Sequence, residues 1–149
     1  MHMAARVDFL RDHLAINDAV LHYSHIVGVR KLVSCLSTCV FPDRTPYPVA
    51  ESMLHEGRPH RSNEGYAMAK RLINTMNRCY ADQYGCRFTS VIPHERPLRQ
   101  FTFSRDLTQL LLWVLDEYDS VEPIILSVGE DGKVSIKDVA LEITRPMDF

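Results

Sequence analysis

The stretch SCLSTCVFPDRTPYPVAESMLHEGRPHRSNEGYAMAK, residues 34–70, decides the fold and holds most of the residues to which we assign chemistry. The run Lys31–Leu36 enters it with apolar residues that do not alternate cleanly, which is typical of a strand covered on both faces. Phe41–Arg61 contains four prolines, which cannot continue a helix or donate regularly to a ladder. We expect this segment to be a long loop beside the functional site, because loops of this length in compact domains are usually functional.

Helices are expected on both sides of this strand and loop. Apolar residues recur at helical spacing over Val7–Val27, and Gly28 follows where a left-handed C-cap belongs. A second helix is expected from about Gly65 to Tyr84, with Asn63 as its N-cap and Gly85 as its stop. Further elements are expected downstream: strands at Phe88–Ile92, Phe101–Phe103 and Ile124–Val128, a helix capped by Asp106 and a last helix from Ser135 to Ile143. The alternation predicts an α/β fold with a largely parallel sheet.

Composition narrows the class of protein. The 149 residues, 46% of them apolar, suffice for one core, and a net charge of −2 with scattered basic residues argues against a nucleic-acid partner. No apolar run approaches the length of a membrane span, and the N-terminus lacks the apolar core of a signal peptide, so we expect a cytoplasmic protein. Neither the four cysteines nor the seven histidines have the spacing of a metal site, and we expect free thiols and no metal.

Tyr66 and Lys70 are one helical turn apart and therefore share a helix face. A lysine ammonium beside a phenol is expected to lower the tyrosine pKa, so the pair can protonate a ketone oxygen that Ser37 also hydrogen-bonds. Tyrosine and lysine also occur at this spacing by chance, so the pair alone is a weak signal. The strand end that carries Ser37, followed by the proline-rich loop, favours catalysis.

Cys39 follows Ser37 by two residues, so on an extended backbone both side chains would point the same way. A thiolate there can act as a base that takes a proton from the carbon next to a carbonyl. The alternative is a buried cysteine that acts as a small apolar residue. The basic run Arg58–Arg61 fits a phosphate contact or, as the commoner alternative, exposed loop charge.

At SCLSTCVFPD (34–43) and SNEGYAMAKRL (62–72) the sequence resembles the GDP-L-fucose synthases, which are NADP-dependent epimerase-reductases of the extended short-chain dehydrogenase/reductase family. The resemblance continues through PLRQFTFSRDLTQLLLWVL (97–115) and VEPIILSVGE (121–130). It implies a Rossmann-like sheet, a GDP-sugar substrate, NADP as cofactor, and a homodimer formed through the helices Val7–Val27 and Asn63–Tyr84.

The resemblance also implies roles for individual residues. Ser37, Tyr66 and Lys70 match the reductase triad, Cys39 matches the epimerisation base, and Arg99 matches a substrate-contacting arginine. The implied cofactor-contacting residues are Cys35, Leu36, Ser37, Thr38, Tyr66, Lys70 and Pro93. It further implies a partial dinucleotide-binding domain at 1–96, which carries the catalytic residues, and a partial substrate-binding region at 97–149.

Three departures from the family pattern stand out. The six glycines include no phosphate-binding cluster, and the chain passes almost directly from Pro93 to Pro97, where the family has a cofactor contact and an acid histidine. The C-terminal substrate region is also shorter than in the family. We therefore expect a homologue truncated at the N-terminus, internally and at the C-terminus. The alternative is an inactive fragment or paralogue that serves as a dimerising interaction module.

Overall fold

The computed structural model describes residues 6–46, 48–93 and 104–127. Its helices and strands alternate along the chain as α1 (Arg6–Ile26), β1 (Leu32–Cys35), α2 (Glu64–Tyr84), β2 (Phe88–Pro93), α3 (Ser104–Asp116) and β3 (Ile124–Leu126). Three short 3₁₀ helices lie between β1 and α2: η1 (Thr38–Val40), η2 (Glu51–His55) and η3 (Arg61–Asn63). The expected strand at 101–103, the expected helix from Ser135 and the substrate-contacting Arg99 lie outside the described residues.

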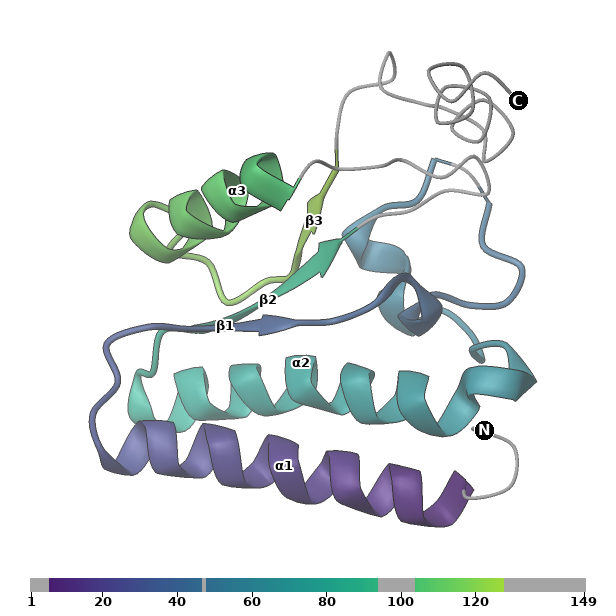
Figure 1. Cartoon of the computed structure of the whole chain (residues 1–149), viewed down its shortest axis with the longest axis horizontal. Helices are drawn as coiled ribbons and strands as arrows, with labels where there is room; N and C mark the ends of the chain where they lie inside the picture. Colours follow the sequence, from purple (N-terminus) through teal and green to yellow (C-terminus); the bar gives the residue numbers. More distant parts are fainter. Residues whose placement is uncertain (1–5, 47, 94–103, 128–149) are drawn as a thin grey trace, which may run out of the picture.

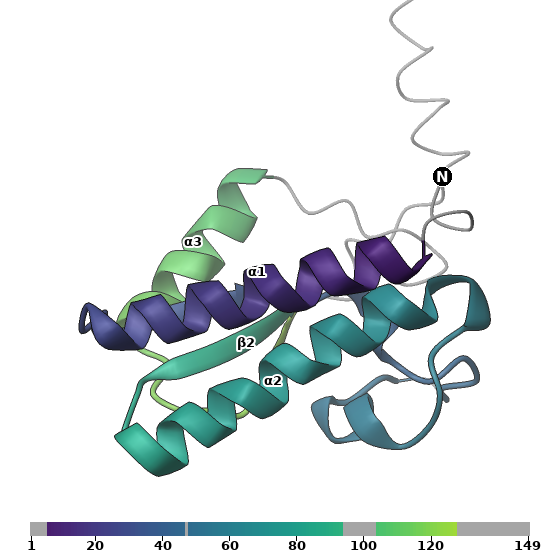
Figure 2. The same ribbon diagram turned by 90° about the horizontal axis from the view of Figure 1, so that it is seen from below.

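The three strands form one parallel sheet in the order β1-β2-β3. The helices α1 and α2 lie side by side beneath this sheet, and α3 covers its other face (Figures 1 and 2). A parallel sheet between helical layers is a Rossmann-like α/β arrangement. The predicted fold class is therefore confirmed.

Burial differs between the strands because of their positions in the sheet. β2 is central and paired on both edges, and Phe88, Val91 and Ile92 are at most 1% exposed. β1 was expected to be covered on both faces, but its residues are only partly buried and Cys35 is exposed. That expectation is wrong for the described structure, because β1 is the edge strand and its outer edge has no partner among the described residues.

Left-handed glycines end both long helices, as predicted. Gly28 has φ 72° after α1 and Gly85 has φ 65° after α2, conformations that cost glycine little. The predicted N-caps are corrected. Asn63 occupies the cap position of α2 without a side-chain cap bond, because η3 leads directly into the helix. Asp106 lies within the first turn of α3, which begins at Ser104.

The core consists of two clusters on opposite faces of the sheet. The cluster between the sheet and α2 contains Leu36, Val40, Phe41, Leu54, Ile73 and Ile92. The cluster between the sheet and α3 contains Val91, Val114 and Leu126. Phe41 and Leu54 both belong to the proline-rich loop, so this loop is anchored by its own buried side chains. Full burial of one such side chain contributes about 1.5–3 kcal/mol. The predicted loop is thus a packed element beside the strand ends.

Candidate active site

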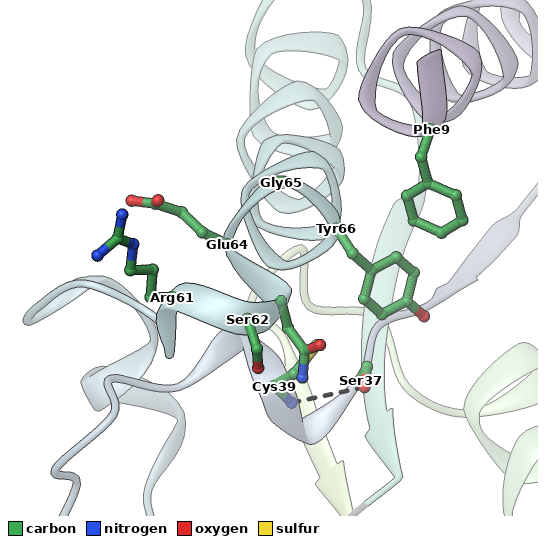
Figure 3. A pocket seen from close by; sticks show the side chains of 9 residues that line it. Phe9, Ser37, Cys39, Arg61, Ser62, Glu64, Gly65 and Tyr66 are labelled. Carbon is green, nitrogen blue, oxygen red and sulfur yellow. Dashed lines mark hydrogen bonds between the residues drawn. The ribbon is translucent and has the colours of Figure 1, made fainter. Parts of the chain in front are cut away.

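Ser37 and Cys39 are placed by the turn that follows β1. Ser37 is the N-cap of η1, with extended φ −149° and ψ 154°, and its Oγ accepts a hydrogen bond from the backbone N–H of Cys39 at 3.5 Å. The expectation of an extended backbone through Cys39 is therefore wrong. The two side chains instead line one hollow because the 3₁₀ turn folds Cys39 back beside Ser37 (Figure 3).

Tyr66 reaches the same hollow from the first turn of α2. Its ring packs against two residues of α1, with ring centroids 5.9 Å from Phe9 and 5.2 Å from His13. Phe9 and His13 are four residues apart and in edge contact with each other, at 4.4 Å. The sequence reasoning missed both aromatic neighbours, although their helical spacing on α1 was a usable signal.

Lys70 follows Tyr66 by one turn, and its amine is directed at the end of β1. Its Nζ donates a hydrogen bond to the backbone carbonyl of Cys35 at 2.7 Å and lies 5.8 Å from the centroid of the Tyr66 ring. The ammonium thus contacts the strand end and the ring face. In this arrangement Lys70 ties α2 to β1.

The pKa of Tyr66 is raised above its usual value. Removal of the hydroxyl from water is the largest cause, the charge of Cys39 adds to it, and the side-chain hydrogen bond with Ser37 acts in the opposite direction. The predicted lowering is wrong for this arrangement, because removal of the hydroxyl from water outweighs the lowering by Ser37, and the Lys70 amine is directed at the Cys35 carbonyl. Tyr66 is a neutral phenol at neutral pH, as any tyrosine is, and the raised pKa means that it holds this proton more tightly.

Ser37, Cys39 and Tyr66 line a pocket of about 450 Å³ beside the turn that follows β1. Its lining residues come from α1, the η1 turn, η3 and the start of α2: Phe9, Ser37, Cys39, Arg61, Ser62, Asn63, Glu64, Gly65 and Tyr66. Arg61 supplies its positive charge and Glu64 its negative charge. The backbone N–H groups at the start of α2 also favour a negatively charged ligand group.

Other predicted residues are separated from this pocket. Cys35 and Lys70 line a smaller cavity of about 180 Å³ between α1 and β1. Leu36 is 5% exposed and donates its backbone N–H to Val91 at 2.8 Å, so its side chain belongs to the core. Thr38 and Pro93 line neither cavity. No group of three metal-ligating side chains gathers within 6–46, 48–93 and 104–127.

Arg71 is a buried residue that the sequence reasoning missed. It is 7% exposed, and its guanidinium donates from Nε to the carbonyl of Val40 at 2.6 Å and from Nη1 to that of Gly57 at 2.7 Å. Burial lowers its pKa. The available signal was its place on one helix face with Ala67 and Asn74, both almost fully buried. Arg71 holds the η1 turn and the proline-rich loop against α2.

The fold and the site agree with comparisons to known proteins. The sequence pattern of the NAD dependent epimerase/dehydratase family matches residues 2–95, more than half of the chain. The chain therefore belongs to the NAD dependent epimerase/dehydratase family. Within this family it is a homologue of the GDP-L-fucose synthases. It is 43% identical to the GDP-L-fucose synthase of Dictyostelium discoideum and 42% identical to the probable GDP-L-fucose synthase of Drosophila melanogaster.

Solved structures give the same relationship. The crystal structure of a GDP-L-fucose synthetase from Naegleria fowleri bound to NADP matches with a TM-score of 0.89 at 37% identity and covers 100% of this chain. A GDP-mannoheptose C4 reductase from Campylobacter jejuni with NADP bound shares the fold, with a TM-score of 0.86 at 21% identity.

The relatives are longer than this chain. The alignment covers 99% of this chain but 58% of the Dictyostelium protein and 60% of the Drosophila protein, and the structural match covers 62% of the Naegleria chain. The Dictyostelium alignment runs over 187 positions, more than the 149 residues of this chain. That relative therefore has internal residues without a counterpart here.

Proposed function

We propose that this chain carries the proton-transfer residues of a GDP-L-fucose synthase-type enzyme, which epimerises and reduces GDP-4-keto-6-deoxy-D-mannose to GDP-L-fucose with NADPH. The supporting observation is that Ser37, Cys39 and Tyr66 line one pocket, with Lys70 one turn further along α2. The identity of 43% to a GDP-L-fucose synthase supports the choice of substrate class. We place the protein in the cytoplasm; none of the described helices is long and apolar enough to cross a membrane.

Each side chain has a distinct role in this proposal. Tyr66, held neutral, donates a proton to the ketone oxygen of the sugar while Ser37 hydrogen-bonds the same oxygen. Cys39 takes protons from the sugar carbons beside the ketone, and the resulting anion is stabilised by the same two hydroxyl groups. Each carbon is inverted when a proton from water then adds to its opposite face. Lys70 holds α2 against the end of β1 through its hydrogen bond to the Cys35 carbonyl. Arg99, outside the described residues, contacts the GDP-sugar.

We assign the reacting end of a nicotinamide cofactor to the end of β1, an assignment supported by the Lys70 amine, which lies 5.8 Å from the centroid of the Tyr66 ring. We also assign cofactor contacts to Cys35, Leu36, Ser37 and Thr38 at this strand end and to Pro93, the last residue of β2. NADPH would supply a hydride to the ketone carbon when bound. The described residues contain no glycine-rich pyrophosphate cradle: the two glycines with positive φ, Gly28 and Gly85, both end helices at the opposite end of the sheet. We assign residues 1–96 to the cofactor and catalytic region and 97–149 to the substrate region.

Two measurements on the purified chain test the proposal. Titration calorimetry with NADPH should show one site per chain, and incubation with the GDP-keto-sugar and NADPH should consume NADPH. Tyr66→Phe, which removes the hydroxyl and keeps the ring, should abolish this consumption. Absence of NADPH binding would refute the enzyme proposal for this chain.

A specific observation supports a second candidate function, an interaction module that forms a homodimer through α1 and α2. Large apolar side chains on α1 and directly after it are exposed: Ile16 59%, Val20 50%, Tyr23 64% and Val27 73%. Contiguous exposed apolar surface of this kind marks interaction sites. Light scattering of the chain across a concentration series tests the proposal, because a homodimer must have twice the mass of the monomer. A monomer at every concentration would refute it.

A further inference from the structure

A second pair of reactive side chains lies at the far end of the molecule from the candidate active site. His25 is in the last turn of α1, Cys86 follows α2, and the Cys86 Sγ lies 3.4 Å from the His25 Nδ1. Both helices end on the same side of the fold, where their left-handed glycines turn the chain (Figure 1). The 21-residue length of α2 separates Cys86 from the Tyr66 pocket by roughly 30 Å.

Both members of this pair are fixed by the structure and remain partly exposed. The His25 ring stacks on Tyr84, with centroids 4.2 Å apart and planes inclined by 25°. Tyr80 lies on another side of the ring, at 5.8 Å, and its backbone carbonyl accepts the N–H of Cys86 at 3.3 Å. Cys86 and His25 are each of intermediate exposure.

The contact is chemically productive because the thiolate is the nucleophilic form of cysteine. An imidazole nitrogen in contact with the sulfur can accept the thiol proton. The carboxyl end of α1 favours the resulting imidazolium, whereas the carboxyl end of α2 disfavours a thiolate at Cys86. The helix end thus disfavours a negative charge on Cys86, and the positive charge that His25 gains with the proton would offset this effect.

A cavity of about 200 Å³ adjoins the Cys86 sulfur. It is lined by two cationic residues, Lys31 and Arg87, and by the carboxylate of Asp119. Asp119 forms an ion pair with Arg87 and lies 3.7 Å from the Lys31 amine. Two cations against one carboxylate leave an excess of positive charge, which favours a ligand with negative charge.

We propose that Cys86 and His25 form a thiol–disulfide exchange site for small disulfides that carry carboxylates. His25 takes the thiol proton, and the Cys86 thiolate attacks one sulfur of the disulfide. The disulfide bond breaks as the new bond to Cys86 forms, and the departing thiolate receives the proton from His25. Cys86 is oxidised and one half of the small disulfide is reduced to a thiol, so atoms and electrons balance.

Exchange with oxidised glutathione tests this site with an internal standard. Cys79 is exposed on α2, and no histidine hydrogen-bonds to it in the described part of the chain. The folded chain is incubated at pH 7.5, and the rate of glutathione addition to each cysteine is followed by peptide mass spectrometry. We expect Cys86 to react about tenfold faster than Cys79, with the ratio near one in guanidinium chloride. A native ratio at or below one would overturn the proposal.

A histidine variant tests the role of the imidazole. His25→Phe preserves an aromatic ring against Tyr84 but has no nitrogen, and it should reduce the Cys86 rate to about that of Cys79. His22→Phe, at an exposed position three residues earlier on α1, is the matched control and should leave the ratio unchanged. An unchanged ratio in His25→Phe would overturn the proposal, and the wild-type ratio remains decisive if that variant does not fold.

A comparison of disulfides with opposite charge tests whether the site prefers carboxylate-bearing disulfides. Cystamine has the same reactive bond with positive ends, so the Cys86-to-Cys79 ratio should be lower with cystamine than with oxidised glutathione. An equal or higher ratio would overturn the assignment to carboxylate-bearing disulfides. None of these measurements depends on NADPH or a sugar nucleotide, so their failure is distinct from failure of the proposed enzymatic function.

Discussion

The Arg71 Nε donates a hydrogen bond to the backbone carbonyl of Val40 at 2.6 Å, although the two residues are 31 positions apart. Val40 directly follows Cys39, and Arg71 directly follows Lys70. This bond therefore joins the turn that carries the candidate base to the helix that carries the candidate acid. The same guanidinium holds Gly57 of the proline-rich loop at 2.7 Å.

Replacement of Arg71 by methionine should destabilise the chain by about 2–4 kcal/mol, because the buried carbonyl of Val40 and the partly buried carbonyl of Gly57 lose charged donors. The free energy of unfolding in urea measures this change. Arg78→Met is the control, since Arg78 lies on the same helix and is less buried. Equal effects of the two substitutions would mean that the bonds to Val40 and Gly57 contribute little.

Cys39→Ser should remove epimerisation and leave the hydroxyl chemistry of Ser37 and Tyr66 in place. A serine hydroxyl is a far weaker base than a thiolate, and loss of a general base costs about 10²–10⁴ in rate. The measurement is deuterium incorporation into the GDP-keto-sugar in D₂O without NADPH, which requires neither hydride transfer nor turnover.

Cys79→Ser is the matched control for the exchange measurement. Cys79 is exposed on α2 and lies outside the lining of the larger pocket, so its replacement should leave deuterium incorporation unchanged. If wild-type chain and Cys39→Ser incorporate deuterium at the same rate, Cys39 is not the base.

The raised pKa of Tyr66 predicts a loss of stability at high pH. The folded chain holds the phenolic proton more tightly than the unfolded chain, so stability should fall as pH rises from about 10 through the raised folded pKa. Tyr66→Phe should lose less stability over this range, measured by urea unfolding at successive pH values. Tyr80→Phe is a useful comparison, because burial raises the pKa of Tyr80 as well. Parallel curves for wild type and Tyr66→Phe would contradict the predicted shift.

The lowered pKa of His55 predicts a loss of stability on the acid side. Partial removal of the ring from water is the main cause, although His55 remains exposed on η2, and the charges of Arg71 and Arg78 add to it. The unfolded chain binds this proton more readily, so stability should fall as pH drops from about 6.5 through the lowered folded pKa. His55→Gln should flatten this part of the profile. The outcome is read from urea midpoints between pH 7.5 and pH 5.

The sequence predicted those elements of the fold that depend on local patterns. Gly28 and Gly85 end their helices as expected, because a left-handed residue after a periodic apolar run is a local signal. The burial of β1 could not be predicted in this way. Its apolar run Leu32–Cys35 resembles a central strand, but exposure depends on which strands lie beside it.

The sequence predicted which residues belong to the candidate site, but it predicted only part of their geometry. The spacing of Tyr66 and Lys70 placed both on α2, and the structure brings Tyr66 to the same pocket as Ser37 and Cys39. The direction of the Lys70 amine depends on the carbonyl of Cys35, a backbone group that residue spacing does not reveal. The Tyr66 pKa was therefore predicted with the wrong sign.

The exposed face of α1 gives a last prediction, about self-association. Ile16, Val20, Tyr23 and Val27 recur every three or four residues and so form one apolar stripe along the helix. If two copies pair through α1 and α2, a charge placed in the stripe must be buried without a partner, which costs several kcal/mol.

Ile16→Glu should therefore raise the dissociation constant of the dimer by about two orders of magnitude or more, measured by sedimentation equilibrium. Ala15→Glu is the matched control: it adds the same charge at an exposed position roughly 100° around the helix from Ile16. It should leave the dimer intact, because its carboxylate would remain in water. Equal weakening by both substitutions would point to a general effect of charge, and no weakening by Ile16→Glu would remove the stripe from the interface. Loss of the dimer in Ile16→Glu alone would identify the stripe as the contact surface between copies.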